Sequence, residues 1–147
     1  MRFYKQLVKH DPDNGRYGDC FRTCLACLLN VPPEDVPHFL AEGNDAFWPA
    51  VTEWLSHHKL SLFHVPFSGD DLQGLFRSMQ HLNPDLLYLL AGKSPRGVNH
   101  QVIAQGDRIL HDPSTEGGGL VGPCVEDGMY WVGLLVPSFI HQGDHHG

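Results

Sequence analysis

Residues 18–29 read GDCFRTCLACLL, and this stretch decides the fold that we expect. From Cys20 to Leu29 it is almost entirely apolar, a Gly-Asp pair precedes it as a cap, and Asn30 followed by two prolines ends it. These are the signals of a short helix with both ends defined. We therefore predict a buried helix over residues 20–29 with a cysteine in its first turn.

The rest of the chain predicts two more helices and a run of strands. Asn44 is expected to cap a helix that runs to His57 or His58, and a further helix is expected over residues 70–82. The predicted strands cover residues 60–67, 86–90, 98–105, 108–111 and 129–136. Helices followed by antiparallel strands indicate an α+β fold with the N-terminal helices packed on the sheet. We expect one domain over residues 1–140 and a flexible tail over 141–147.

Composition excludes several classes of protein. The chain has 147 residues, 41% hydrophobic and 18% charged, which suits a globular domain and not a disordered chain. A net charge of −7 disfavours binding to nucleic acid or to an anionic membrane. No apolar run approaches the ~20 residues of a membrane helix, and the first residues lack a signal-peptide core, so we expect a cytoplasmic protein.

The cysteines of the predicted helix have different expected roles. Backbone N–H groups at a helix N-terminus favour the thiolate form of a cysteine, which makes Cys20 a candidate nucleophile. Cys24 and Cys27 share its face but lie deeper, so we expect them in the core. The alternative is a structural zinc site built on these three cysteines, completed by Cys124 or a histidine. We predict no metal and no cofactor.

His100 and Asp112 are candidates for the base and for the group that orients it, because a thiol nucleophile needs both. A three-residue hairpin loop over 105–107 would place His100 opposite Asp112 on one face of the sheet. A two-residue turn over 106–107 would place Asp112 opposite Gln101, on the other face. A Cys-His-Asp site therefore predicts the longer loop with a bulge.

These patterns together resemble the papain-like cysteine peptidases. The nearest likeness is to the bacteriocin-processing peptidase domains of ABC exporters, which carry a glutamine, four residues, Asp-Cys and a helix that continues into Leu-Ala. The same pattern is found at Asp19-Cys20 and Leu25-Ala26, and Asn14 stands at the position of the glutamine. His100 begins a strand and Asp112-Pro113 follows the next one, as in the family. The likeness spans about residues 14–136 and implies a papain-like fold in a small standalone bacterial or phage protein.

The resemblance implies a role for each matched residue. It makes Cys20 the nucleophile, His100 the base and Asp112 the group that orients His100. Asn14 holds the position of the family's oxyanion glutamine, although Asn14-Gly15 is also a plain turn signal. Phe21 replaces the family's usual small residue beside the cysteine and is expected to narrow or reshape the cleft. With no exporter attached, processing of double-glycine leaders is not implied.

The function that we expect is hydrolysis of an amide or isopeptide bond by a thiol peptidase or amidase. The expected partner is a peptide or another amide-containing substrate, and the oligomeric state stays open. The alternatives are an acyl or amide transferase on the same triad, a catalytically inactive papain-like binding module, and the zinc protein described above. Trp48, Trp54 and Trp131 are candidates for the cleft lining, although aromatic residues at such spacing more often belong to the core.

Overall fold

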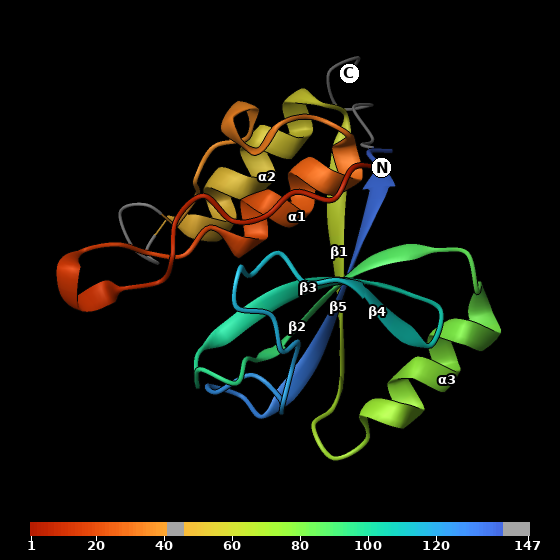
Figure 1. Ribbon diagram of the computed structural model, residues 1–147. Coiled ribbons are helices and arrows are strands. Elements are labelled where there is room, and N and C mark those ends of the chain that lie inside the picture. The colour runs from red at the N-terminus through yellow and green to blue at the C-terminus, as the bar shows by residue number, and fades with distance from the viewer. Residues whose placement is uncertain (41–45, 140–147) are drawn as a thin grey trace.

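The computed structural model describes residues 1–40 and 46–139. Within these residues it is an α+β fold in which helices pack on a five-stranded sheet (Figure 1). The helices are α1 (Cys20–Leu29), α2 (Phe47–His57) and α3 (Leu72–Leu82), with 3-10 turns at Pro12–Asn14 and Pro33–Asp35. The strands are β1 (Leu60–Ser68), β2 (Leu87–Lys93), β3 (Asn99–Gln105), β4 (Arg108–His111) and β5 (Met129–Pro137).

The sheet has the strand order β1-β5-β2-β3-β4, and every neighbouring pair is antiparallel. The prediction that N-terminal helices precede a C-terminal antiparallel sheet is confirmed in part. The first strand, β1, follows α2, and α3 lies between β1 and β2. Because β1 pairs with β5, the two ends of the sheet-forming region lie side by side.

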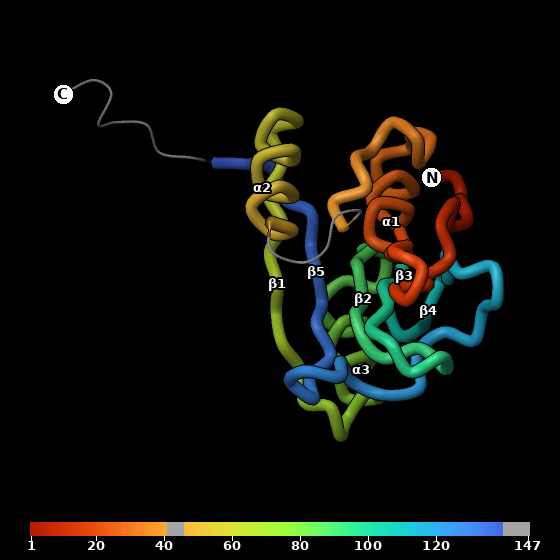
Figure 2. Tube along the Cα trace, turned by 90° about the vertical axis from the view of Figure 1, so that its left-hand side faces the viewer, coloured from red at the N-terminus to blue at the C-terminus, as the bar shows by residue number. Residues whose placement is uncertain are grey.

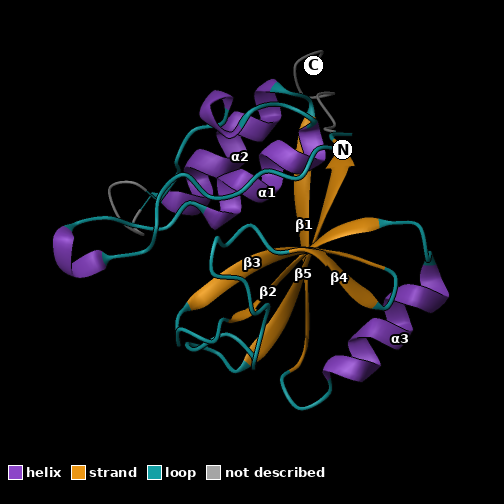
Figure 3. Ribbon diagram, viewed as in Figure 1, coloured by secondary structure: helices purple, strands orange, loops and turns teal. Residues whose placement is uncertain are grey.

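Helices cover both faces of the sheet (Figure 3). Alternate residues of β2 and β3 divide the core into two clusters, as the two-residue repeat of a strand requires. Leu89 and Ile103 pack with α1 and α2, whereas Tyr88, Leu90 and Val102 pack with α3. The first cluster holds α1 against the sheet and so fixes the position of its N-terminus.

The hairpin of β3 and β4 has a two-residue turn, so the predicted three-residue loop is wrong. Gln105 pairs with Arg108 across the turn. Gly106 has φ +59° at the first turn position, as a type II′ turn requires. The Tyr88 hydroxyl donates to the Gly106 carbonyl oxygen at 2.7 Å, which ties the turn to β2.

The shorter turn alone would place Asp112 on the opposite face of the sheet from His100, and a bulge in β4 reverses this. The pairing shifts between Ala104 and Ile103, which leaves Leu110 as an extra residue on β4. One extra residue reverses the alternation of all side chains beyond it. As a result, the side chain of Asp112, which follows β4, lies on the same face of the sheet as the side chain of His100.

The N-terminal segment, residues 1–19, begins beside α1 and reaches the loop after β4 (Figure 2), and its 3-10 turn projects beyond the helix (Figure 1). The Gln6 N–H donates to the Pro113 carbonyl oxygen at 2.8 Å. The Asp19 carboxylate, which is buried, accepts from the Leu7 N–H at 3.2 Å and the Val8 N–H at 3.0 Å. Asp19 therefore occupies the cap position of α1 but makes no side-chain cap bond, contrary to the role expected for it.

Two other expectations concern the ends of elements. The Asn44 cap and the tail over 141–147 lie outside the described residues. The described α2 begins at Phe47, with Ala46 at its cap position. None of the helices formed by residues 1–40 and 46–139 has the length and apolar character needed to cross a membrane.

Candidate functional site

Cys20 is the first residue of α1 and is partly exposed, unlike the other cysteines of the helix. Its backbone N–H belongs to the first turn, where N–H groups have no partner within the helix. Its position follows from the core, because the apolar face of α1 packs on β3 and Cys20 stands at the end of that helix. The structure thus presents one thiol of α1 to solvent, at the positive end of the helix dipole.

His100 lies near the start of β3 and is 6% exposed. Its Nε2 lies 2.6 Å from Asp112 Oδ1. Burial alone would lower the pKa of His100, but hydrogen bonds with Asp112 and Cys20 outweigh it and raise the pKa to about 9. With Nε2 engaged by the carboxylate, Nδ1 is the ring nitrogen left for the thiol.

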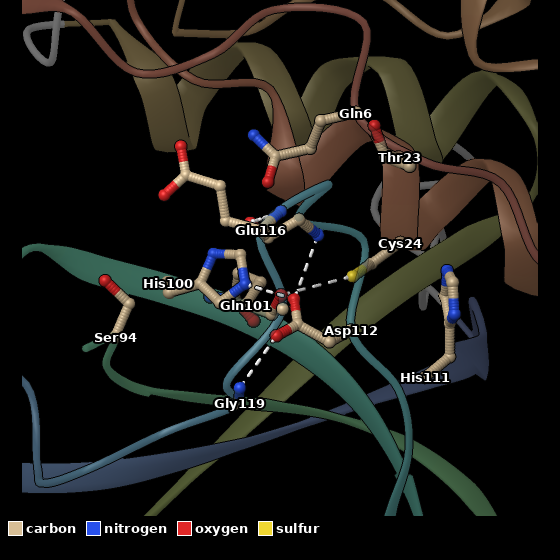
Figure 4. A network of polar contacts seen from close by, with 12 residues as sticks. Gln6, Thr23, Cys24, Ser94, His100, Gln101, His111, Asp112, Glu116 and Gly119 are labelled. Carbon is tan, nitrogen blue, oxygen red and sulfur yellow. Dashed lines mark hydrogen bonds and ion pairs between the residues drawn. The ribbon is translucent and has the colours of Figure 1, made fainter. Parts of the chain in front are cut away.

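Three contacts hold the two carboxylate oxygens of Asp112 (Figure 4), and a fourth holds its backbone carbonyl oxygen. Besides His100, Oδ1 accepts from the Ser114 N–H at 2.9 Å, and Oδ2 accepts from the Gly119 N–H at 2.8 Å. The Lys5 ammonium donates to the Asp112 carbonyl oxygen at 2.9 Å. Burial alone would raise the pKa of Asp112, but the bonds from His100 and the two backbone N–H groups lower it to about 2.

Cys20 and His100 lie where two hollows of the surface meet. We call the first, of about 450 Å³, the aromatic arm. Its principal lining residues besides this pair are Phe21, Phe39, Phe47, Trp48, His64, Glu126, Asp127 and Trp131. We call the second, of about 380 Å³, the polar arm; it is lined mainly by Gln6, Lys9, His10, Arg96, Ser114 and Glu116. A bound chain could therefore extend in both directions from the thiol.

The aromatic arm contains two of the three tryptophans that the sequence offered for a cleft. Trp48 and Trp131 line it, whereas Trp54 packs against the first core cluster. Phe21 forms an inner wall, with its ring edge-on to Phe47 at 5.2 Å and to Trp48 at 5.8 Å between centroids. A small residue at position 21 would leave this wall open.

Asn14, the expected oxyanion residue, does not line either arm. Its side-chain amide donates to Asp11 Oδ2 at 2.7 Å within an exposed 3-10 turn that ends at Gly15. Gln6 is a side-chain amide of the N-terminal segment that lines the polar arm. Its Nε2 lies 3.2 Å from where a Cβ on Gly18 would be, two residues before the candidate nucleophile.

Sequence reasoning missed Gln6 because it measured a fixed offset along the chain. Gln6 lies on the N-terminal segment, which Asp19 holds against the start of α1. It is the one glutamine that precedes Cys20 in the sequence. Its residue type is thus a signal in the sequence that could have drawn attention to this position.

The remaining cysteines are buried thiols. Burial raises the pKa of Cys24 well above its ordinary value, raises that of Cys27, and raises that of Cys124 to about 11. The Cys24 thiol donates to the Gln101 carbonyl oxygen at 3.6 Å (Figure 4). Among residues 1–40 and 46–139, no three histidine, cysteine or acidic side chains are grouped closely enough to hold a metal ion.

Comparisons with known proteins give no relative for this arrangement. No family model matches the chain, and neither a curated protein nor a solved structure shows significant similarity to it. The class that the fold and cleft define is an α+β domain with a cysteine, a histidine and an aspartate at one surface. The function has to be argued from that geometry.

Proposed function

We propose that the protein is a papain-like thiol hydrolase that cleaves an amide or isopeptide bond through Cys20, His100 and Asp112. The observation that carries the proposal is the 2.6 Å contact of His100 Nε2 with Asp112 in a cleft that also exposes Cys20. A partly exposed thiol at a helix N-terminus, a histidine beside it and a carboxylate behind the histidine are the parts that thiol catalysis needs.

In the first step, Cys20 Sγ attacks the substrate carbonyl carbon as a thiolate, and His100 carries the proton. The tetrahedral intermediate collapses to a thioester as the C–N bond breaks and His100 protonates the departing amine. Water then attacks the thioester while His100 accepts its proton. The acid leaves and Cys20 and His100 return to their starting state. Asp112 keeps the imidazole oriented and stabilises its positive charge throughout.

Two donors could stabilise the oxyanion of the tetrahedral intermediate. One is the Cys20 backbone N–H, which has no partner within the helix. We propose the Gln6 side-chain amide as the other, in place of Asn14. Its Nε2 donates to the Val8 carbonyl oxygen at 3.2 Å, a bond that holds the amide in the region of Gly18 while a second N–H remains for the substrate.

The test is cleavage of a mixed peptide library, with products identified by mass spectrometry. The wild-type protein is expected to release fragments that carry one added water, and Cys20→Ala is expected to lose at least about 10³-fold in rate. Circular dichroism of the variant checks that it folds. Products joined to an added amine would instead identify a transferase. Cleavage unchanged in Cys20→Ala would refute the proposal.

A further inference from the structure

The two arms of the cleft differ in charge. In the aromatic arm, Glu126 and Asp127 are exposed acidic residues at the rim. The third acidic residue there, Asp19, is buried and paired with Arg22 at 2.9 Å, so these two charges offset each other. Burial lowers the pKa of His64, which keeps this ring neutral near pH 7. His100, whose pKa is raised to about 9, is already paired with Asp112 at 2.6 Å. Among the described residues that line the aromatic arm, Glu126 and Asp127 are therefore the acidic side chains without an ion-pair partner.

The acidic side chain among the described lining residues of the polar arm, Glu116, is already paired with two cations. Lys9 Nζ lies 2.6 Å from Glu116 Oε1, and Arg96 Nη1 lies 4.0 Å from Glu116 Oε2. The Arg96 guanidinium also donates to the Gly117 carbonyl oxygen at 2.9 Å. A ligand thus meets a carboxylate shared by two cations on this side of Cys20, and carboxylates without an ion-pair partner on the other.

The tryptophans of the aromatic arm are arranged around His64. Trp48 and His64 are edge-to-face, with 4.7 Å between ring centroids, and Trp131 is edge-to-face with His64 at 6.2 Å. Trp48 is 47% exposed, so the core covers only part of its side chain. Its uncovered surface can therefore contact a ligand.

A carboxylate is fixed beside one of these rings. The Trp131 indole N–H donates to Asp127 Oδ2 at 2.7 Å, and the Met129 N–H donates to Asp127 Oδ1 at 2.9 Å. Glu126 accepts from the side-chain amide of Asn99, the residue before His100. Each carboxylate can accept about four hydrogen bonds, so both retain capacity for a ligand.

An aromatic face next to a carboxylate is a binding site for a cation on an apolar stem. The ring attracts the charge through its quadrupole, the carboxylate pairs with it, and the apolar walls cover the methylene groups. Lysine and arginine side chains have this form. An acidic side chain would be repelled by the rim.

We propose that the aromatic arm binds a lysine or arginine side chain of the substrate, on one side of the bond that is cleaved. That this ligand is a substrate rests on the proposed function, whereas the binding of a basic side chain does not. Glu126 and Asp127 would supply the charge, and Trp48 and Trp131 would supply the contact surface. The preference belongs to one side of the bond, because the polar arm lacks unbalanced carboxylates.

The first experiment compares cleavage of peptides that contain arginine with matched peptides that contain citrulline, which keeps the shape and removes the charge. The wild-type protein is expected to prefer arginine by about fivefold to thirtyfold, at one position relative to the cleaved bond. The double variant Glu126→Gln, Asp127→Asn is expected to bring the ratio near one, and the matched control Asp85→Asn, outside the cleft, is expected to keep it. Equal cleavage of both peptides by the wild type would overturn the proposal.

The second experiment needs no turnover and uses the Cys20→Ala variant. N-acetyl-arginine methylamide is expected to shift the NMR signals of the Trp48 and Trp131 indoles and to leave Trp54 unchanged. N-acetyl-citrulline methylamide is expected to shift them much less at equal concentration. Such binding without any peptide cleavage by the wild type would refute the proposed function and support this inference. Equal shifts with both probes would overturn the inference.

Discussion

His100 lies between a carboxylate and a thiol that come from opposite halves of the chain. Its ring is buried, and Asp112 engages one nitrogen at 2.6 Å. The backbone N–H groups of Ser114 and Gly119 hold that carboxylate in place. The orientation of the imidazole is therefore set by a loop whose own backbone is fixed, which is what a general base requires.

Replacing Asp112 with asparagine tests the orienting role at the scale of one residue. Asp112→Asn keeps an acceptor oxygen for the loop but removes the charge that stabilises the imidazolium. We expect a loss of activity between about 10-fold and about 10⁴-fold, with the fold retained. Steady-state rates of peptide cleavage and a thermal unfolding curve measure the two effects. Unchanged turnover would remove Asp112 from the mechanism.

The same pair predicts how stability depends on pH. The pKa of His100 rises from 6.5 to about 9 on folding, so its contribution is complete below pH 6.5 and is lost as the pH rises towards 9. The pKa of Asp112 falls from 3.8 to about 2, so its contribution is complete above pH 3.8 and is lost as the pH falls towards 2. Both contributions are therefore complete only between about pH 4 and pH 6.5.

Denaturant unfolding of the wild type and of His100→Ala measures this dependence. The difference between their free energies of unfolding is expected to be largest from about pH 4 to pH 6.5 and to shrink towards pH 9 and towards pH 2. Taking the difference cancels groups that titrate alike in both proteins. A difference that stays constant from pH 5 to pH 9 would contradict the charged pair.

At the scale of elements, α1 and α3 both begin after an aspartate, but the two carboxylates act differently. Asp71 Oδ1 accepts from the Gly74 N–H at 2.8 Å and caps α3. Asp19 instead pairs with Arg22 and accepts from the N–H groups of the N-terminal segment. Asp19 therefore joins the helix that carries Cys20 to the segment that carries Gln6.

Alanine substitutions at these two positions should differ in cost. Asp71→Ala removes an exposed cap, and we expect a loss of about 1 kcal/mol of unfolding free energy. Asp19→Ala leaves the Arg22 charge and two backbone N–H groups without their partner, and we expect about 3–5 kcal/mol. Urea unfolding of both variants gives the comparison. Equal losses would contradict the role of Asp19 in joining α1 to the N-terminal segment.

The local elements could be predicted from the sequence because their signals are local. The helix over residues 20–29 has the predicted bounds, since a turn signal stands at each end of an apolar run. The strand before α3 and the antiparallel sheet also agree with the prediction. The pairing of β1 with β5 was not predictable, because it joins segments about 70 residues apart and has no local signal.

The hairpin shows why the site could be predicted only in part. We predicted that Asp112 lies on the same face of the sheet as His100, and that a three-residue loop over 105–107 places it there. In the structure, a two-residue turn and a bulge at Leu110 together place it on that face. The Gly106-Asp107 turn signal is visible in the sequence, whereas nothing at Leu110 marks a bulge.

At the scale of the whole molecule, the candidate site depends on the docking of three parts. Cys20 comes from α1, His100 and Asp112 come from the β3–β4 region, and Gln6 comes from the N-terminal segment. Lys5 donates to two carbonyl oxygens of the loop after β4 and so links the N-terminal segment to that loop. The central claim is that this assembly activates one thiol out of four.

Alkylation by limiting iodoacetamide at pH 6, with the modified cysteine identified by mass spectrometry, tests this claim most directly. Our account predicts that Cys20 alone is labelled, because Cys24, Cys27 and Cys124 are buried with raised pKa values. His100→Ala is expected to slow the labelling sharply, whereas His64→Ala, a histidine of the same cleft that does not contact the thiol, is expected to leave the rate nearly unchanged. Equal labelling of Cys20 and Cys124, with a rate that His100→Ala does not change, would contradict the account.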